Sequence, residues 1–175
     1  FLGEPKVKQK KNNNTLIFRT ESSIPPVLPI KLKVEINCRE HFNMLGLEEV
    51  DFKMNNLWFS GSCKIKTYKL DELVGTKVRA LYERRKGRDL YKALQNTELN
   101  TDNVICCFKG YMEKEEKKPS YKLYISNMED KMKNEEFLGD TKTLLRPDEI
   151  YDVQQAYKIV KEFIIDKLAT EGNIE

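Results

Sequence analysis

The most constraining feature of the sequence is a change of hydrophobic period near residue 69. Before it, apolar and polar residues alternate from Ile30 to Asn37, with apolar side chains at 30, 32, 34 and 36. A period of two residues is typical of a strand. After it, apolar residues recur every three or four positions, as on one face of a helix. They are Leu70, Leu73, Val74, Val78 and Leu81. Strands first and helices second predict an α+β fold.

Further elements follow from local patterns. Short strands are predicted at 15–20 and 63–67. Helical segments are predicted at 69–95 with an end or bend at Gly87, at 104–117, at 121–133, and from the Pro147-Asp148-Glu149 turn to Leu168. The chain then divides into a β-rich part at 1–68, basic helices at 69–95 and a helical C-terminal domain at 96–175. The aromatic residues expected in the core are Trp58, Phe59, Phe108 and Tyr111.

Composition excludes two classes of protein. Hydrophobic residues make up 39% of the chain, which is enough for a core and excludes disorder of the whole chain. No stretch approaches the ~18 uncharged apolar residues of a membrane span. Four cysteines with a single histidine, His41, argue against a structural zinc site, and His41 is given no role. We expect reduced thiols and a cytoplasmic protein.

The segment from Lys77 to Lys92 is the most unusual in the chain. It holds seven basic residues and two acids, a local charge of 7 − 2 = +5, although the whole chain carries only +3. Arginine contacts phosphate with two parallel hydrogen bonds, and lysine provides a point charge. The segment therefore fits a nucleoside triphosphate or a nucleic-acid backbone. The alternative is a solvated basic helix face.

A carboxylate on the best strand is a second candidate. Glu35 lies on the polar face of the strand at 30–37. Such a carboxylate can ligate a metal ion or act as a general base. The alternative is a cross-strand ion pair with a neighbouring lysine.

The order of these motifs resembles the AbiEii/AbiGii toxin family. The matching stretches are the strand IKLKVEIN, then YKLDEL, and then KVRALYERRKGRDLY at 77–91. The family comprises nucleotidyltransferases of the DNA polymerase β superfamily, from abortive-infection and type IV toxin–antitoxin systems. The resemblance implies a remnant of a nucleotidyltransferase mixed β-sheet, followed by a helical C-terminal domain.

The resemblance also implies an activity. Members transfer a nucleotide from a nucleoside triphosphate (NTP), with Mg²⁺, to an RNA acceptor such as the end of a tRNA, and a cognate antitoxin is a further expected partner. Glu35 matches the third acid of the metal and catalytic site, and Asp89 matches a second catalytic position. The residues matching nucleotide- or phosphate-binding positions are Lys77, Arg84, Lys86 and Arg88.

Two departures limit this comparison. Lys92 replaces the second acid of the family's R-D-L-x-D-L run. The superfamily's Gly-Ser turn followed by D-x-D is also missing, because Gly61-Ser62 leads to Asp71-Glu72-Leu73. We therefore expect that an N-terminal segment of the parent protein is absent and that this chain alone is inactive. The alternative is a non-catalytic module that binds RNA or an antitoxin through the basic helix at 77–92.

Overall fold

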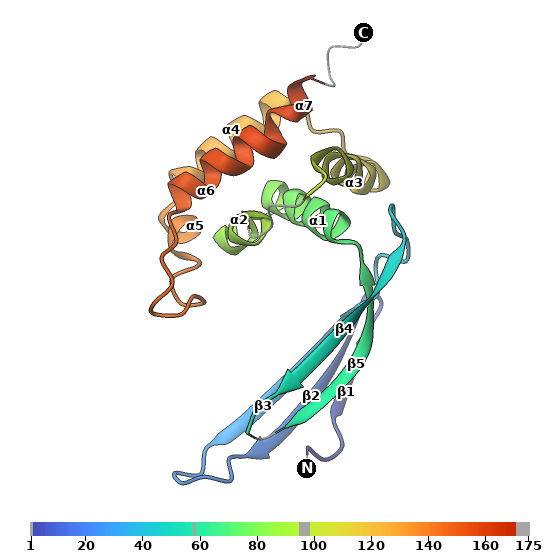
Figure 1. The fold of residues 1–175 in the computed structure, drawn as a ribbon, viewed down its shortest axis with the longest axis vertical. Helices are drawn as coiled ribbons and strands as arrows, with labels where there is room; N and C mark the ends of the chain where they lie inside the picture. The colour runs from blue at the N-terminus through green and yellow to red at the C-terminus, as the bar shows by residue number, and fades with distance from the viewer. Residues whose placement is uncertain (1, 58, 95–98, 171–175) are drawn as a thin grey trace. The chain divides into compact units, whose positions relative to one another are not determined.

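The chain folds into two compact units, Phe1–Phe42 and Asn43–Glu175. The computed structural model describes residues 2–57, 59–94 and 99–170. The first unit is a small sheet, and the second contains two further strands and all the described helices, so the α+β class is confirmed (Figure 1). The division between the units falls at 42/43, and the last strand of the chain's described part ends at Tyr68, within the second unit.

The first unit is a three-stranded antiparallel sheet in the order β1-β2-β3. Its strands are β1 (Lys6–Lys10), β2 (Asn13–Glu21) and β3 (Pro29–Asn37). The strands predicted at 15–20 and 30–37 are confirmed, and β1 was not predicted. The register pairs Leu32 with Phe18 and Val34 with Leu16, which places these apolar side chains on one face. The apolar side chains of β3 nevertheless remain exposed, because no second layer of this unit covers them among the described residues.

The second unit begins with an antiparallel pair, β4 (Leu47–Asn55) and β5 (Ser60–Tyr68). The strand predicted at 63–67 is confirmed as part of β5, whereas β4 was not predicted. The expected core position of Phe59 is wrong, because this side chain is 60% exposed. Its ring instead covers Gly61, where a Cβ atom would lie 2.7 Å from Phe59 Cζ. Trp58 lies outside the described residues.

The helices of the second unit enclose the core. They are α1 (Leu70–Glu83), α2 (Gly87–Leu94), α3 (Thr101–Lys114), α4 (Tyr121–Met132), α5 (Glu135–Gly139), α6 (Val153–Val160), the π-helical turn η1 (Lys161–Ile165) and α7 (Lys167–Thr170). Helix α1 packs on α2 and α3, and α6 packs on α2 (Figure 1). Val78 and Leu81 of the predicted stripe are fully buried, and so are Phe108 and Tyr111, as expected.

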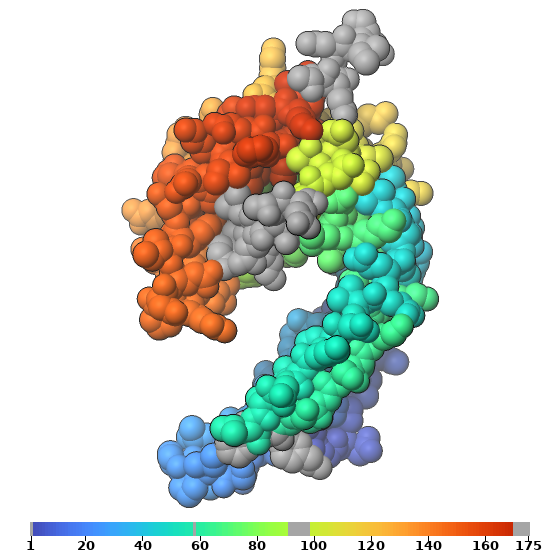
Figure 2. All heavy atoms as spheres, viewed as in Figure 1, coloured from blue at the N-terminus to red at the C-terminus, as the bar shows by residue number. Residues whose placement is uncertain are grey.

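Two helix boundaries differ from the prediction. Helix α1 ends at Glu83, and Gly87 begins α2 rather than ending the preceding helix. The Pro147-Asp148-Glu149 turn does not start a helix, because the last helical region begins at Val153. There the Asp152 side chain accepts hydrogen bonds from the N–H groups of Gln154 and Gln155, which is an N-cap. The preceding stretch from α5 to α6 runs over the surface of this unit (Figure 2).

Candidate functional site

The junction between α1 and α2 brings most of the predicted site residues together. Arg84 adopts an extended conformation directly after α1, and its N–H group binds the carbonyl of Ala80. Three residues later Gly87 opens α2 against α5, where a Cβ atom would lie only 2.2 Å from the carbonyl oxygen of Phe137. Only glycine permits this close approach of two backbones. The sequence therefore forms a tight, fixed turn between two helices.

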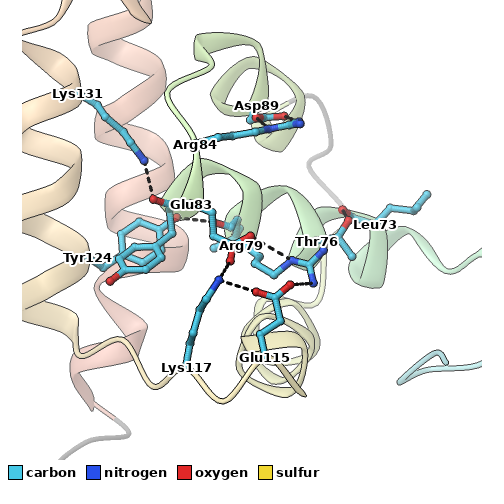
Figure 3. A network of polar contacts seen from close by, with 12 residues as sticks. Leu73, Thr76, Arg79, Glu83, Arg84, Asp89, Glu115, Lys117, Tyr124 and Lys131 are labelled. Carbon is cyan, nitrogen blue, oxygen red and sulfur yellow. Dashed lines mark hydrogen bonds and ion pairs between the residues drawn. The ribbon is translucent and has the colours of Figure 1, made fainter. Parts of the chain in front are cut away.

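Asp89 binds Arg84 in a two-pronged contact. The Nε and Nη2 atoms of Arg84 donate to the two carboxylate oxygens of Asp89 at 2.7 and 2.8 Å (Figure 3). The Nζ atom of Lys77 lies 3.9 Å from the same carboxylate. Asp89 is 1% exposed, whereas half of the Arg84 side chain is accessible to solvent. The hydrogen bond that Arg84 donates to Asp89 raises the pKa of Arg84 above its usual value. Asp89 thus fixes a guanidinium group that still faces solvent.

Asp140 organises the other two predicted phosphate-binding residues. One of its oxygens accepts from the backbone N–H of Arg88 at 3.2 Å, close to the N-terminus of α2. The other oxygen lies 3.5 Å from Arg88 Nη1 and 3.8 Å from Lys86 Nζ. Lys86 also pairs with Glu136 at 3.3 Å. No local pattern indicated Asp140, because it lies 52 residues from Arg88 in the sequence.

We call Lys77, Arg84, Lys86 and Arg88 the basic cluster. Its four cations lie next to three carboxylates, those of Asp89, Glu136 and Asp140, so these groups together carry +4 − 3 = +1. The local charge of the sequence segment therefore overstates the positive charge of the folded surface. Between a third and a half of each basic side chain remains accessible to solvent. Acidic side chains therefore hold the basic side chains of the cluster in place, and enough of each basic side chain stays exposed to contact a ligand.

Glu35 lies in the other compact unit, on β3. Its carboxylate is 2.6 Å from Lys33 Nζ, and about half of its side chain is exposed. The ion pair runs along one strand, since positions 33 and 35 face the same side, rather than across strands as the alternative interpretation expected. The described residues contain no group of three or more acidic, histidine or cysteine side chains able to hold a metal ion.

A buried lysine, Lys131, binds the C-terminal end of α1. The Lys131 ammonium group binds the carbonyls of Leu81 and Tyr82, the latter at 2.8 Å (Figure 3). Burial, with a smaller contribution from the charge of Arg85, lowers the pKa of Lys131 from 10.5 to about 8. Even a neutral amine can donate to both carbonyls. Lys131 thus satisfies carbonyls that the helix end leaves without an intrahelical partner.

This pKa predicts a pH-dependent stability. Between pH 8 and 10.5 the unfolded chain keeps the Lys131 proton while the folded chain loses it, so the free energy of unfolding should rise with pH. Urea unfolding at pH 7.5, 9 and 10 should show the wild type gaining stability relative to Lys131→Met. Lys133→Met, at an exposed position, serves as the control, and its difference from the wild type should stay constant. If the difference in free energy of unfolding between the wild type and Lys131→Met does not change with pH, the lowered pKa of Lys131 is wrong.

The fold and the cluster together define an α+β protein with an oriented arginine–lysine surface, the kind of surface on which phosphate groups bind. Comparison with family models then matches residues 2–159 to the family described as nucleotidyl transferase AbiEii toxin, type IV TA system. The chain belongs to this family, and the resemblance found in its motifs is confirmed. No curated protein matches the chain, and no solved structure does either. Among the described residues, no helix is long and apolar enough to cross a membrane.

Proposed function

We propose that this chain carries the triphosphate-binding surface of a toxin that transfers a nucleotide from an NTP to an RNA acceptor, namely a tRNA end. Membership of the nucleotidyl transferase toxin family supports the reaction class. The main support for placing the triphosphate here is the pair of hydrogen bonds by which Asp89 orients Arg84. A cognate antitoxin is the protein partner that a type IV system implies.

Each residue of the basic cluster has a role in this proposal. Nucleotidyl transfer releases pyrophosphate, whose negative charge must be stabilised as the bond to the α-phosphate breaks. Arg84 and Arg88 offer planar donor groups to phosphate oxygens, and Lys77 and Lys86 add point charges. Asp89 acts as a positioning residue for Arg84, because its enclosed carboxylate fixes the guanidinium plane before the ligand arrives.

The family resemblance also implies Mg²⁺, which Glu35, Asp89 and Asp140 do not fit as they are paired in the structure. Glu35 is paired with Lys33, and Asp89 and Asp140 are occupied by arginine and lysine side chains. We expect that this chain alone, incubated with Mg²⁺, radiolabelled NTPs and total tRNA, incorporates no label. Incorporation above the level of a heat-denatured control would overturn the proposed inactivity.

Nucleotide binding tests the proposed surface. Arg84→Lys keeps a cation beside Asp89 but removes the planar donor pair, and Arg88→Ala removes one phosphate contact. Each should weaken NTP binding by about tenfold, which corresponds to about 1.4 kcal/mol. Isothermal titration calorimetry with ATP, GTP, CTP and UTP measures the effect, and thermal melting confirms that the variants fold.

Arg146→Ala is the matched control, since Arg146 is exposed and lies outside the basic cluster. It should leave NTP affinity unchanged within twofold. If no NTP binds, or if the cluster variants bind as the wild type does, the triphosphate assignment is wrong. RNA binding that depends strongly on salt, without NTP binding, would instead favour the non-catalytic module.

A further inference from the structure

A cavity of about 680 Å³ opens in the second unit, away from the residues of the basic cluster. It lies among the C-terminal half of α3, the connection from α3 to α4, the first turn of α4, and α7. Its volume falls within the range of about 300–1,000 Å³ that is usual for small-molecule sites. None of the residues assigned to the triphosphate lines it.

Part of the cavity lining is apolar. Phe108, Met112 and Leu168 form its base, and all three belong to the buried core. Pro119 and Tyr121 are half-buried and line it as well. The Tyr121 hydroxyl donates to Asp166 at 2.9 Å, which holds this ring in place. A rigid wall of aromatic, proline and aliphatic groups suits a flat, weakly polar body such as a nucleobase.

Another part of the lining is basic. Four lysines line the cavity, at positions 109, 117, 118 and 122, against a single acid, Glu113. Lys117 pairs with Glu83 and Glu115 and is held in place by them (Figure 3). Lys118 and Lys122 are exposed beside the start of α4. With Glu83 and Glu115 counted, these groups carry +4 − 3 = +1, so a small positive excess remains for an anion.

The first turn of α4 strengthens this preference. It contains no acid and carries Lys122 itself, so cations gather at the positive end of a helix dipole. The first turns of α6 and α7 also lack an acid, whereas those of α1, α2, α3 and α5 each hold at least one. Lysines at a helix N-terminus repel the dipole and one another, and a bound anion relieves both effects.

We propose that this cavity is a second binding site, and that its ligand is a nucleotide. The phosphate lies between Lys118 and Lys122 at the start of α4, and the base lies on the wall formed by Pro119 and Tyr121. A free mononucleotide and the terminal nucleotide of an RNA share this chemistry. The site is independent of the triphosphate surface, so either assignment can fail without the other.

Two variants test the site. The double variant Lys118→Glu/Lys122→Glu reverses the charge beside α4 at exposed positions, which should not disturb folding. Ala169→Phe fills the cavity from α7, where Ala169 is half-buried. Lys8→Glu/Lys158→Glu is the control, because it makes the same change in net charge at exposed lysines outside the cavity. Binding of AMP is measured by calorimetry, and binding of a fluorescein-labelled adenosine hexanucleotide by anisotropy.

The site predicts that both cavity variants weaken binding by at least tenfold while the control stays within twofold. If AMP and the hexanucleotide lose affinity together, the cavity binds the nucleotide unit that the two probes share, as proposed. If the hexanucleotide alone binds and loses affinity in the variants, the ligand is an RNA end. Unchanged binding of both probes in both variants would overturn the site. Competition by inorganic phosphate as strong as by AMP would also overturn it, since the cavity would then recognise an anion without a base.

Discussion

Replacing Gly87 by alanine should lower the free energy of unfolding by about 2–4 kcal/mol, which is the range expected when backbone must move in a packed interior. The new Cβ atom would lie 2.2 Å from the carbonyl oxygen of Phe137 and 3.3 Å from its carbonyl carbon. Both are backbone atoms, so no side chain can rotate away. The start of α2 must therefore separate from α5, and Asp140 must lose its contact with the N–H of Arg88.

Gly139→Ala provides the matched control for this prediction. Gly139 ends α5, and a Cβ atom there meets nothing within 4 Å. Alanine is favoured over glycine in a helix by about 1 kcal/mol at most, so this variant should be neutral or slightly stabilised. Urea denaturation followed by far-ultraviolet circular dichroism measures both variants. Equal stabilities of the two variants would show that the backbones at Gly87 do not approach so closely.

Glu72→Gln should have an effect of similar size, about 2–4 kcal/mol, because it disrupts a fully buried carboxylate with three donors. Glu72 accepts from the backbone N–H groups of Met44 and Leu45 at 2.7 and 2.9 Å. It also accepts from the Tyr111 hydroxyl at 2.8 Å. An amide has one oxygen, so its NH₂ group must face at least one of these donors.

The control for Glu72 is Glu129→Gln, at an exposed position of α4, which should change stability by less than about 0.5 kcal/mol. Hydrogen exchange adds a local readout. In Glu72→Gln at least one of the amides of Met44 and Leu45 should exchange faster than in the wild type, since the NH₂ group replaces its acceptor oxygen. If stability and exchange match the wild type, the carboxylate does not hold this loop against α1.

Regular elements were predictable where one residue pattern dominates. The alternation at Ile30–Ile36 and the stripe from Leu70 to Leu81 each define a face, and both became the predicted elements. β1 was missed because its sequence, KVKQK, is polar apart from one valine. The helix expected after Pro147 failed because the local acids and proline resemble a helix start, while Asp152 makes the actual cap. Which of two possible N-caps starts a helix depends on the tertiary structure, which the local sequence does not reveal.

The candidate site was only partly predictable for a different reason. Arg84, Lys86, Arg88 and Asp89 are neighbours in sequence, so a local motif could group them. Their tertiary partners Glu136 and Asp140 are about fifty residues away, and they change the charge that the cluster presents. Lys131 and Glu72 bind backbone groups, which no side-chain pattern encodes.

The most direct test of the triphosphate surface is nuclear magnetic resonance of the arginine side chains during titration with the non-hydrolysable ATP analogue AMP-PNP. The Nε–H resonances of Arg84 and Arg88 should shift in a saturable way, because phosphate oxygens approach these guanidinium groups. The resonance of the exposed Arg146 should stay in place. Saturable binding that leaves both Arg84 and Arg88 unshifted would contradict the central claim, since the nucleotide would then bind elsewhere on the chain.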